Sequence, residues 1–295
     1  MRDVLIALAP ATVAGAVLFG LKAVITVLLC VACSVLSEFV FNLICKKEQT
    51  VGDLSAAVTG LILGLILPAK TEIWHCVLGS VFAIIVVKCL FGGLGCNFAN
   101  PAATARVFLL ISFAGSVGGG TDPSTDLVAS ATPLEMIKLS TEKNISDIKD
   151  LPSLFDMLIG YRAGAIGETC AIALIIGGIY LIVRGVIKWH TPVIYIATVF
   201  LFSLIISGNV VEALYHVLGG GLLIAAFFMI TDYVTSPIGS YGKMLFAFGC
   251  GVLTVLLRYF GAYPEGVSFA ILIMNILSPY IEKMFVKRPF GKVGK

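Results

Sequence analysis

The chain has 295 residues, of which 59% are hydrophobic and 13% are charged, with a formal net charge of +3 and a mean hydropathy of +1.03. Soluble domains carry about a quarter charged residues, so this composition excludes an ordinary soluble protein and indicates a polytopic membrane protein. No aqueous segment combines clustered Lys and Arg with aromatic residues, so we expect no nucleic-acid partner.

Ten apolar segments follow one another along the sequence and predict an all-α fold with about ten transmembrane helices. They lie at residues 4–20, 23–45, 54–68, 74–91, 101–117, 165–187, 192–207, 211–231, 241–260 and 265–285. The third and seventh are short for a full span of about 20 residues. The third starts at Asp53 and stops at Pro68, which favours a tilted or broken helix. The first run, from Val4, has almost no basic lead and no small-residue cleavage site before the next span, so we expect no cleavable signal peptide.

A single long polar loop, residues 118–162, separates the first five segments from the last five. If the N-terminus is cytoplasmic, this loop is extracytoplasmic and eleven of the twenty basic residues fall inside, as the positive-inside rule favours. These are Arg2, Lys46, Lys47, Arg184, Lys188, Lys243, Lys283, Lys287, Arg288, Lys292 and Lys295. We therefore expect both termini in the cytoplasm.

The two halves of the chain, residues 1–117 and 163–295, read as an internal repeat. In each half a basic residue and an aromatic precede a glycine turn, and a proline then opens an apolar helix. The matched residues are Pro68 with Pro237, Lys88 with Arg258 and Pro101 with Pro264, at separations of 169, 170 and 163 residues. Five spans in each half force the two repeats to be inverted in the membrane. The alternative is that glycine–proline turns between apolar helices look alike by chance.

Thr132 is the most notable residue of the loop, because it lies in a segment of small residues directly before a proline. A threonine before proline is usually only a turn residue. Here the small neighbours Ala129, Ser130 and Ala131 would let a bulky modification or a partner approach the backbone, and Asp126 lies six residues upstream.

Ionisable residues in or beside the apolar segments are costly in lipid, so they tend to pair or to mark a pathway. We expect Lys88 and Arg258 to lie at interfaces beside their glycine turns. Asp53, Glu168 and Asp232 are better functional candidates, because each lies at a helix end flanked by Gly, Ser or Thr, where it could bind a flavin or a cation. The three histidines are scattered, and no metal site is predicted.

The segment from Asp126 through Ser130 to Thr132 resembles the flavin-attachment motif of the Rnf and sodium-translocating NADH:quinone reductase (Nqr) families. Further stretches agree across nearly the whole chain. They are Phe91-Gly-Gly-Leu-Gly-Cys-Asn97-Phe-Ala-Asn100-Pro-Ala102, Gly164-Ala-Ile-Gly-Glu168 to Gly178, Gly219-Gly-Gly to Thr231-Asp232-Tyr-Val-Thr235-Ser-Pro237, and Arg258-Tyr-Phe-Gly-Ala-Tyr-Pro264-Glu265-Gly. As a set they are similar to the D subunit of the Rnf complex, in the family that includes the B subunit of Nqr.

This resemblance implies an electron-carrying membrane subunit of an ion-translocating ferredoxin:NAD oxidoreductase. FMN would be joined through its phosphate to the Thr132 hydroxyl, and a non-covalent riboflavin is associated with such subunits. Electrons would come from a neighbouring FMN-bearing subunit on the outer face and pass to the NAD-binding cytoplasmic subunit, coupled to transport of Na⁺ or H⁺. Asn97, Asn100, Glu168 and Asp232 are predicted as further flavin contacts.

A different function suits the same architecture. An inverted repeat with broken helices would equally serve a channel or transporter for a small solute, and fold alone does not decide function. The loop with Ser130 and Thr132 separates the two, because a channel has no need of it. No motif for NAD, ferredoxin or an iron–sulfur cluster is present, so we predict that the chain has no complete active site by itself.

Overall fold

The computed structural model describes residues 1–123, 129–143, 151–261 and 265–285. The first half begins with α1 (Arg2–Ile44), which is broken at Gly20. The backbone there has φ 67° and ψ −152°, a conformation that is essentially restricted to glycine. After a short 3₁₀ turn, η1 (Val51–Asp53), come α2 (Ser55–Ile66), α3 (Ile73–Val81) continuing into the π-helix η2 (Phe82–Cys89), α4 (Pro101–Ser112) and α5 (Ala114–Val117).

The described parts of the polar loop contain two short strands and two helices. Strand β1 (Gly120–Thr121) pairs antiparallel with β2 (Ala129–Ser130), and α6 (Pro133–Lys143) and α7 (Leu154–Ile159) follow. The second half then holds α8 (Ala171–Val183), α9 (His190–Ser207), α10 (Val210–Leu218), α11 (Leu222–Ile224) continuing into the π-helix η3 (Ala225–Met229), α12 (Ser240–Phe260) and α13 (Val267–Met284).

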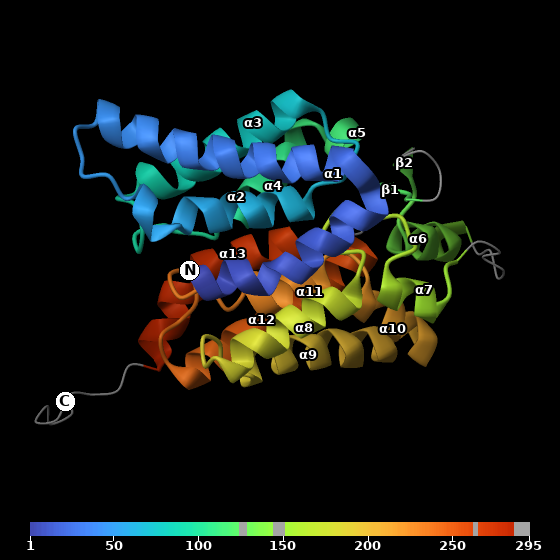
Figure 1. Cartoon of the computed structure of the whole chain (residues 1–295). Coiled ribbons are helices and arrows are strands. Elements are labelled where there is room, and N and C mark those ends of the chain that lie inside the picture. Colours follow the sequence, from blue (N-terminus) through green and yellow to red (C-terminus); the bar gives the residue numbers. More distant parts are fainter. Residues whose placement is uncertain (124–128, 144–150, 262–264, 286–295) are drawn as a thin grey trace, which may run out of the picture.

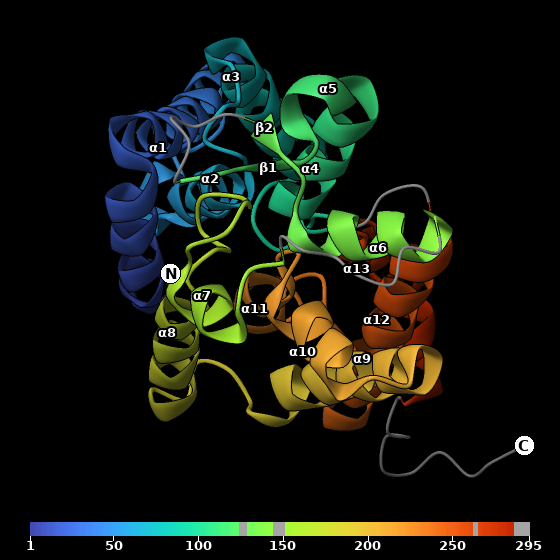
Figure 2. The same ribbon diagram turned by 90° about the vertical axis from the view of Figure 1, so that its right-hand side faces the viewer.

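The helices form two groups, as Figure 1 shows. The second arm of α1 packs with α2, α3 and α4 in one group, and α9, α10, α12 and α13 form the other. Among the contacts between the two halves of the chain, the first arm of α1 lies against α8, and α4 lies against α13. Figure 2 looks onto the end that carries β1, β2, α6 and α7, which we name the loop end. The opposite end, with the N-terminus, is named the N-terminal end.

Four described helices are long and apolar enough to cross a membrane: α1, α9, α12 and α13. A fifth span is obtained if α10 and the stretch Leu222–Met229, which are bent by 61° relative to each other, are counted together. The prediction of an all-α membrane protein is confirmed. Each of the ten predicted segments contains helix, but α2, α4, α8 and the Ile73–Cys89 helix are shorter than 18 residues.

Three predicted segments differ from the structure. The segment 101–117 is divided at Phe113, which separates α4 from α5. The segment 211–231 is not one helix, because Gly220 and Gly221 adopt positive φ values of 63° and 69° and break it between α10 and α11. In the segment 165–187, helix begins only at Ala171. Residues 166–168 before it form a turn that bonds to the end of α2, where Gly167 N donates to Leu65 O at 2.7 Å and Ile166 N donates to Leu67 O at 3.1 Å.

Candidate functional site

Thr132 caps the N-terminus of α6. Its Oγ1 accepts a hydrogen bond from the backbone N–H of Glu135 at 3.3 Å, and its carbonyl accepts the bond from Met136 N at 2.9 Å. A threonine side chain is well suited to this position, where the first N–H groups of a helix lack partners. Only 3% of Thr132 is exposed, so α6 and its neighbours hold the hydroxyl in place.

The two strands fix where Thr132 lies. Ser130 pairs with Gly120, and Thr121 pairs in turn with Gly164, so the loop is tied to the extended segment before α8. Gly120 permits this approach, since a Cβ there would lie 2.6 Å from the Gly164 nitrogen. Asp126, the predicted neighbour of the Thr132 site, lies outside the described residues.

A cavity of about 250 Å³ opens beside the segment that contains Thr132, although Thr132 itself is not one of its lining residues. Ser130, Ala131 and Pro133, which flank the threonine, form one wall, and Tyr161, Arg162 and Ala163 form another. The remaining lining residues are Asp122, Pro123, Met136, Pro152 and Asp156. The small residues predicted to admit a bulky group at Thr132 therefore do border open space.

Arg162 was not predicted as a site residue, although it is buried in this cavity wall with 3% exposure. Its Nη2 donates to the carbonyls of Glu168 at 2.7 Å and Leu218 at 2.8 Å, and its Nε donates to that of Thr169 at 3.3 Å. The guanidinium thus joins the start of α8 to the end of α10. No sequence motif signals this role, because the accepting carbonyls come from separate segments.

Glu168 lies between the cavity and the broken helix, and lines neither the Thr132 cavity nor the pocket described next. Its carboxylate is close to two glycines: a Cβ on Gly164 would lie 2.9 Å from Oε1, and one on Gly221 would lie 3.1 Å from Oε2. Gly221 is the N-cap of α11. The carboxylate is therefore buried beside the residue that precedes α11.

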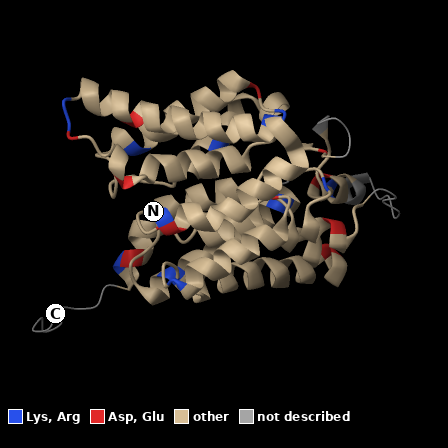
Figure 3. Ribbon diagram, in the orientation of Figure 1, with Lys and Arg blue, Asp and Glu red and all other residues tan. Residues whose placement is uncertain are grey.

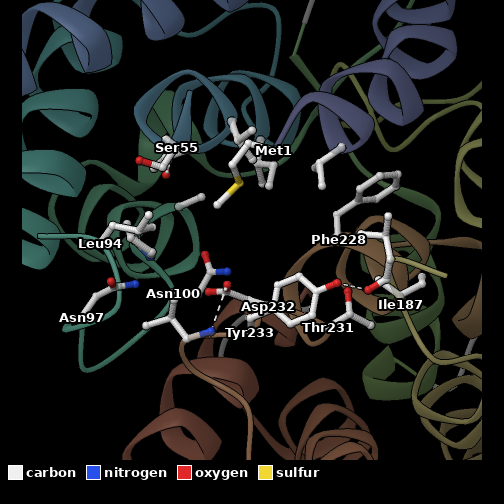
Figure 4. A pocket seen from close by; sticks show the side chains of 18 of the residues that line it. Met1, Ser55, Leu94, Asn97, Asn100, Ile187, Phe228, Thr231, Asp232 and Tyr233 are labelled. Carbon is white, nitrogen blue, oxygen red and sulfur yellow. Dashed lines mark hydrogen bonds between the residues drawn. The ribbon is translucent and has the colours of Figure 1, made fainter. Parts of the chain in front are cut away.

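A second pocket, of about 200 Å³, lies at the N-terminal end (Figure 4). It brings together three predicted site residues, Asn97, Asn100 and Asp232, which come from the two halves of the chain. Phe227, Phe228, Thr231, Tyr233, Met1, Lys88 and Ser55 are among its other lining residues. We name it the N-terminal pocket.

The polar side chains of the N-terminal pocket differ in their hydrogen-bond partners. Asn100 caps α4, with Oδ1 accepting from Ala103 N at 3.1 Å. The Asp232 carboxylate, in the turn after η3, accepts from Thr235 Oγ1 at 3.1 Å and from Val234 N at 3.4 Å, and burial raises the pKa of this carboxyl. Asn97 Oδ1 is buried without a hydrogen-bond partner among the described residues. It is available to a ligand donor.

Lys88 and Arg258, which were predicted to lie at membrane interfaces, are both buried within the protein, at 2% and 3% exposure. Lys88 Nζ pairs with Glu38 Oε1 at 2.7 Å and donates to Ser55 Oγ at 2.5 Å, at the first residue of α2. The chain around the glycine break supplies carbonyl partners for Arg258, which donates to His216 O, to Gly219 O at 3.0 Å and to Gly220 O at 3.3 Å. Asp53 also bonds to Ser55, the first residue of α2, because its Oδ1 accepts a hydrogen bond from Ser55 N at 2.7 Å.

Comparison with known proteins now decides the family. The model of the NQR2, RnfD, RnfE family matches residues 1–291. The chain belongs to this family. The resemblance inferred from the motifs is thereby confirmed.

Three relatives illustrate how the NQR2, RnfD, RnfE family matches this chain. It is 43% identical to the D subunit of the Na⁺-translocating ferredoxin:NAD⁺ oxidoreductase complex of Acetobacterium woodii, covering 99% of this chain and 90% of the relative. It is 37% identical to the D subunit of the proton-translocating ferredoxin:NAD⁺ oxidoreductase complex of Clostridium ljungdahlii, with 99% and 91% covered. It is 33% identical to the D subunit of the ion-translocating oxidoreductase complex of Halorhodospira halophila, again with 99% and 91% covered.

Proposed function

We propose that this chain is the flavin-bearing membrane subunit of an ion-translocating ferredoxin:NAD oxidoreductase complex. FMN is attached as a phosphoester to Thr132, and a non-covalent riboflavin occupies the N-terminal pocket. The observation that carries the proposal is the position of Thr132, which caps α6 beside an open cavity in a chain 43% identical to the D subunit of such a complex. A bound flavin supplies one-electron chemistry, while the protein fixes its position and excludes water.

The surroundings of Thr132 fit an attached phosphate. A phosphoester on the N-cap residue places a negative charge at the positive end of α6, where backbone N–H groups and the helix dipole favour anions. Helix α6 has 11 residues, which is long enough for this effect. The cavity beside Ser130 and Ala131 offers space for the rest of the nucleotide.

The N-terminal pocket fits a flavin without phosphate. Asn97 and Asn100 provide amide groups, Asp232 provides a carboxylate, and Phe227 and Phe228 provide aromatic surface. The one Lys or Arg side chain among its described lining residues, Lys88, is already paired with Glu38, so no basic side chain there is free for a phosphate. This combination favours neutral riboflavin over FMN.

The two sites lie at opposite ends of the protein. The first arm of α1 runs from Met1, which lines the N-terminal pocket, to Leu18, which lies against Gly160 at the loop end. About 17 residues of helix correspond to roughly 25 Å. Figure 3 shows Lys and Arg at both ends of the described protein. The cytoplasmic location of the N-terminal end, with loop 118–162 extracytoplasmic, is supported by the eleven basic residues that the positive-inside rule then assigns to the cytoplasm.

Electrons therefore cross the membrane through this protein. The neighbouring FMN-bearing subunit delivers them on the outer face to the Thr132 flavin, and they leave toward the NAD-binding subunit on the cytoplasmic side. One of the relatives is named as sodium-translocating and another as proton-translocating, so the transported cation is Na⁺ or H⁺. The complex resides in the cytoplasmic membrane.

The inverted repeat is part of this proposal, with residues 1–117 and 163–295 as its halves. Lys88 bonds at the start of α2, and Arg258 bonds to the carbonyls just before α11. The N-caps of these helices, Leu54 and Gly221, are both left-handed. Pro264, one of the sequence landmarks, lies outside the described residues, as do the basic residues from Lys287 to Lys295. In each half, a buried basic side chain therefore lies at the start of a short helix. This shared arrangement supports the proposal that the two halves are related five-helix units.

Replacing Thr132 with alanine tests the covalent flavin. The complex is expressed with its native flavin transferase, and the denatured protein is examined by intact mass and in-gel flavin fluorescence. We expect an added FMN mass and fluorescence in the wild type, and neither in Thr132→Ala, because alanine has no hydroxyl to esterify. The control Ser153→Ala, at the exposed N-cap of α7 and outside the motif, keeps both signals. An unmodified wild type would leave a solute channel as the explanation, which flux into reconstituted vesicles would measure.

Replacing Asn97 with alanine tests the second flavin. The variant removes the unpartnered Oδ1, so acid-extractable flavin per protein is expected to fall about tenfold at limiting riboflavin, as for the loss of one good hydrogen bond of about 1.4 kcal/mol. The Thr132 flavin remains in the denatured protein. Asn209→Ala, at the exposed N-cap of α10, is the control that should retain both flavins. Equal riboflavin content in both variants would place riboflavin elsewhere.

A further inference from the structure

Arg162 carries a buried positive charge that makes no contact ion pair with a described carboxylate, and Glu168 is the nearby carboxylate that interacts with it at longer range. Its Nε and Nη2 bond to neutral carbonyls, and no described carboxylate lies within ion-pair distance. Its Nη1 has no hydrogen-bond partner in the part of the chain that the structure describes. A buried, unpaired guanidinium is costly, so an anion is the expected missing partner.

The unpartnered nitrogen lies beside the first turn of α6. A Cβ placed on Gly219 would be 3.5 Å from Arg162 Nη1 and 3.2 Å from Leu134 Cγ, so both atoms adjoin the same point. Leu134 is the second residue of α6, two positions after Thr132. Arg162 also lines the cavity whose other wall is formed by the residues that flank Thr132. Arg162 and the residues that flank Thr132 therefore border the same cavity, and the Leu134 side chain lies close to Arg162 Nη1.

We propose that Arg162 binds the phosphate of the flavin attached to Thr132, through the N–H groups of Nη1. This inference rests on the proposed function. A phosphoester to threonine keeps one negative charge and two free oxygens, and Arg is the side chain best matched to phosphate oxygens. The three carbonyl bonds hold the guanidinium in place before the flavin arrives, so little freedom is lost when the phosphate binds.

A comparable arginine shows what distinguishes Arg162. Arg106 is equally buried at the loop end, but its Nη1 donates to Val117 O at 2.9 Å and its Nη2 pairs with Glu265 Oε2 at 2.9 Å. Its charge is thus neutralised by the protein. Arg106 does not line the Thr132 cavity, which makes it the matched control.

The test measures the distance between the phosphorus and the arginine nitrogens directly. The complex is expressed with its flavin transferase and ¹⁵N-arginine, purified in a phosphate-free detergent, and studied by solid-state ³¹P–¹⁵N dipolar recoupling. The resonance that is missing from Thr132→Ala identifies the Thr132 phosphoester. We expect this resonance to be dephased by nitrogen within roughly 4 Å, the separation that a charge-assisted N–H···O bond to phosphate gives. Dephasing should vanish in Arg162→Lys, whose lysine is unlabelled, and persist in Arg106→Lys.

Each result has a separate meaning. A wild type without any Thr132 phosphoester overturns the proposed function itself. A phosphoester that is present but not dephased in the wild type overturns the role of Arg162 alone, and this measurement needs no variant to fold. Dephasing that survives in Arg162→Lys also overturns it, since another arginine would then be the contact.

Discussion

Replacing Lys88 with methionine is expected to lower the free energy of unfolding by about 3–5 kcal/mol, because it leaves the Glu38 carboxylate buried without its cation. The two side chains are 2–3% exposed and pair at 2.7 Å. Methionine is similar in length and fills the space, so the loss is electrostatic. Thr50 Oγ1, at 2.7 Å from Glu38 Oε1, supplies only a neutral hydrogen bond to the remaining charge. Unfolding in mixed micelles, followed by circular dichroism, measures the change.

Two further variants identify the cause. Adding Glu38→Gln to Lys88→Met removes the uncompensated charge, so the double variant should recover most of the stability that the single one loses. Lys47→Met, on an exposed lysine in the same region, should be nearly neutral. If the double variant is as unstable as Lys88→Met, the loss comes from packing and the electrostatic explanation is wrong.

Replacing Gly177 with alanine is the second large effect that we expect. A Cβ on Gly177 would lie 2.1 Å from the carbonyl oxygen of Ala7, so the first arm of α1 and helix α8 would have to separate. Small residues at such crossings allow helix backbones to approach in the membrane. Because backbone atoms cannot move aside as a flexible side chain can, we expect a loss of about 3 kcal/mol. The same micelle unfolding assay reports it.

Gly115→Ala is the control for this substitution. Gly115 lies in α5, and a Cβ there would meet nothing within 4 Å. Alanine also favours helix over glycine, so this variant should be neutral or slightly more stable. A loss of similar size in both variants would show that glycine flexibility, and not the close approach of α1 and α8, is what the protein requires.

The apolar runs predicted where helices would lie, because hydropathy and the prolines at positions 68 and 101 mark their ends. The break at Gly220 and Gly221 was missed, since three glycines inside an apolar run do not lower its hydropathy enough to divide it. The burial of Lys88 and Arg258 was missed for a related reason. A sequence shows which residues are charged, but not that Glu38 or the carbonyls of another helix lie opposite.

The candidate sites were predicted in part. Asn97, Asn100 and Asp232 were each selected from their own segment, and the topology then places them in one pocket. Glu168 was selected by the same reasoning but lies apart from both cavities. Arg162 could not have been found from the sequence. Its distinguishing feature is Nη1, which has no hydrogen-bond partner among the described residues, while Nε and Nη2 bond to carbonyls of separate segments.

The break at Gly20 also affects how the protein is made. The second arm of α1 finds its partner α2 soon after it leaves the ribosome. The first arm packs against α8, which is synthesised more than 150 residues later. At ordinary elongation rates this interval is roughly 10–30 s. During that time the N-terminal arm faces lipid alone, so final assembly of the protein must await translation of its second half.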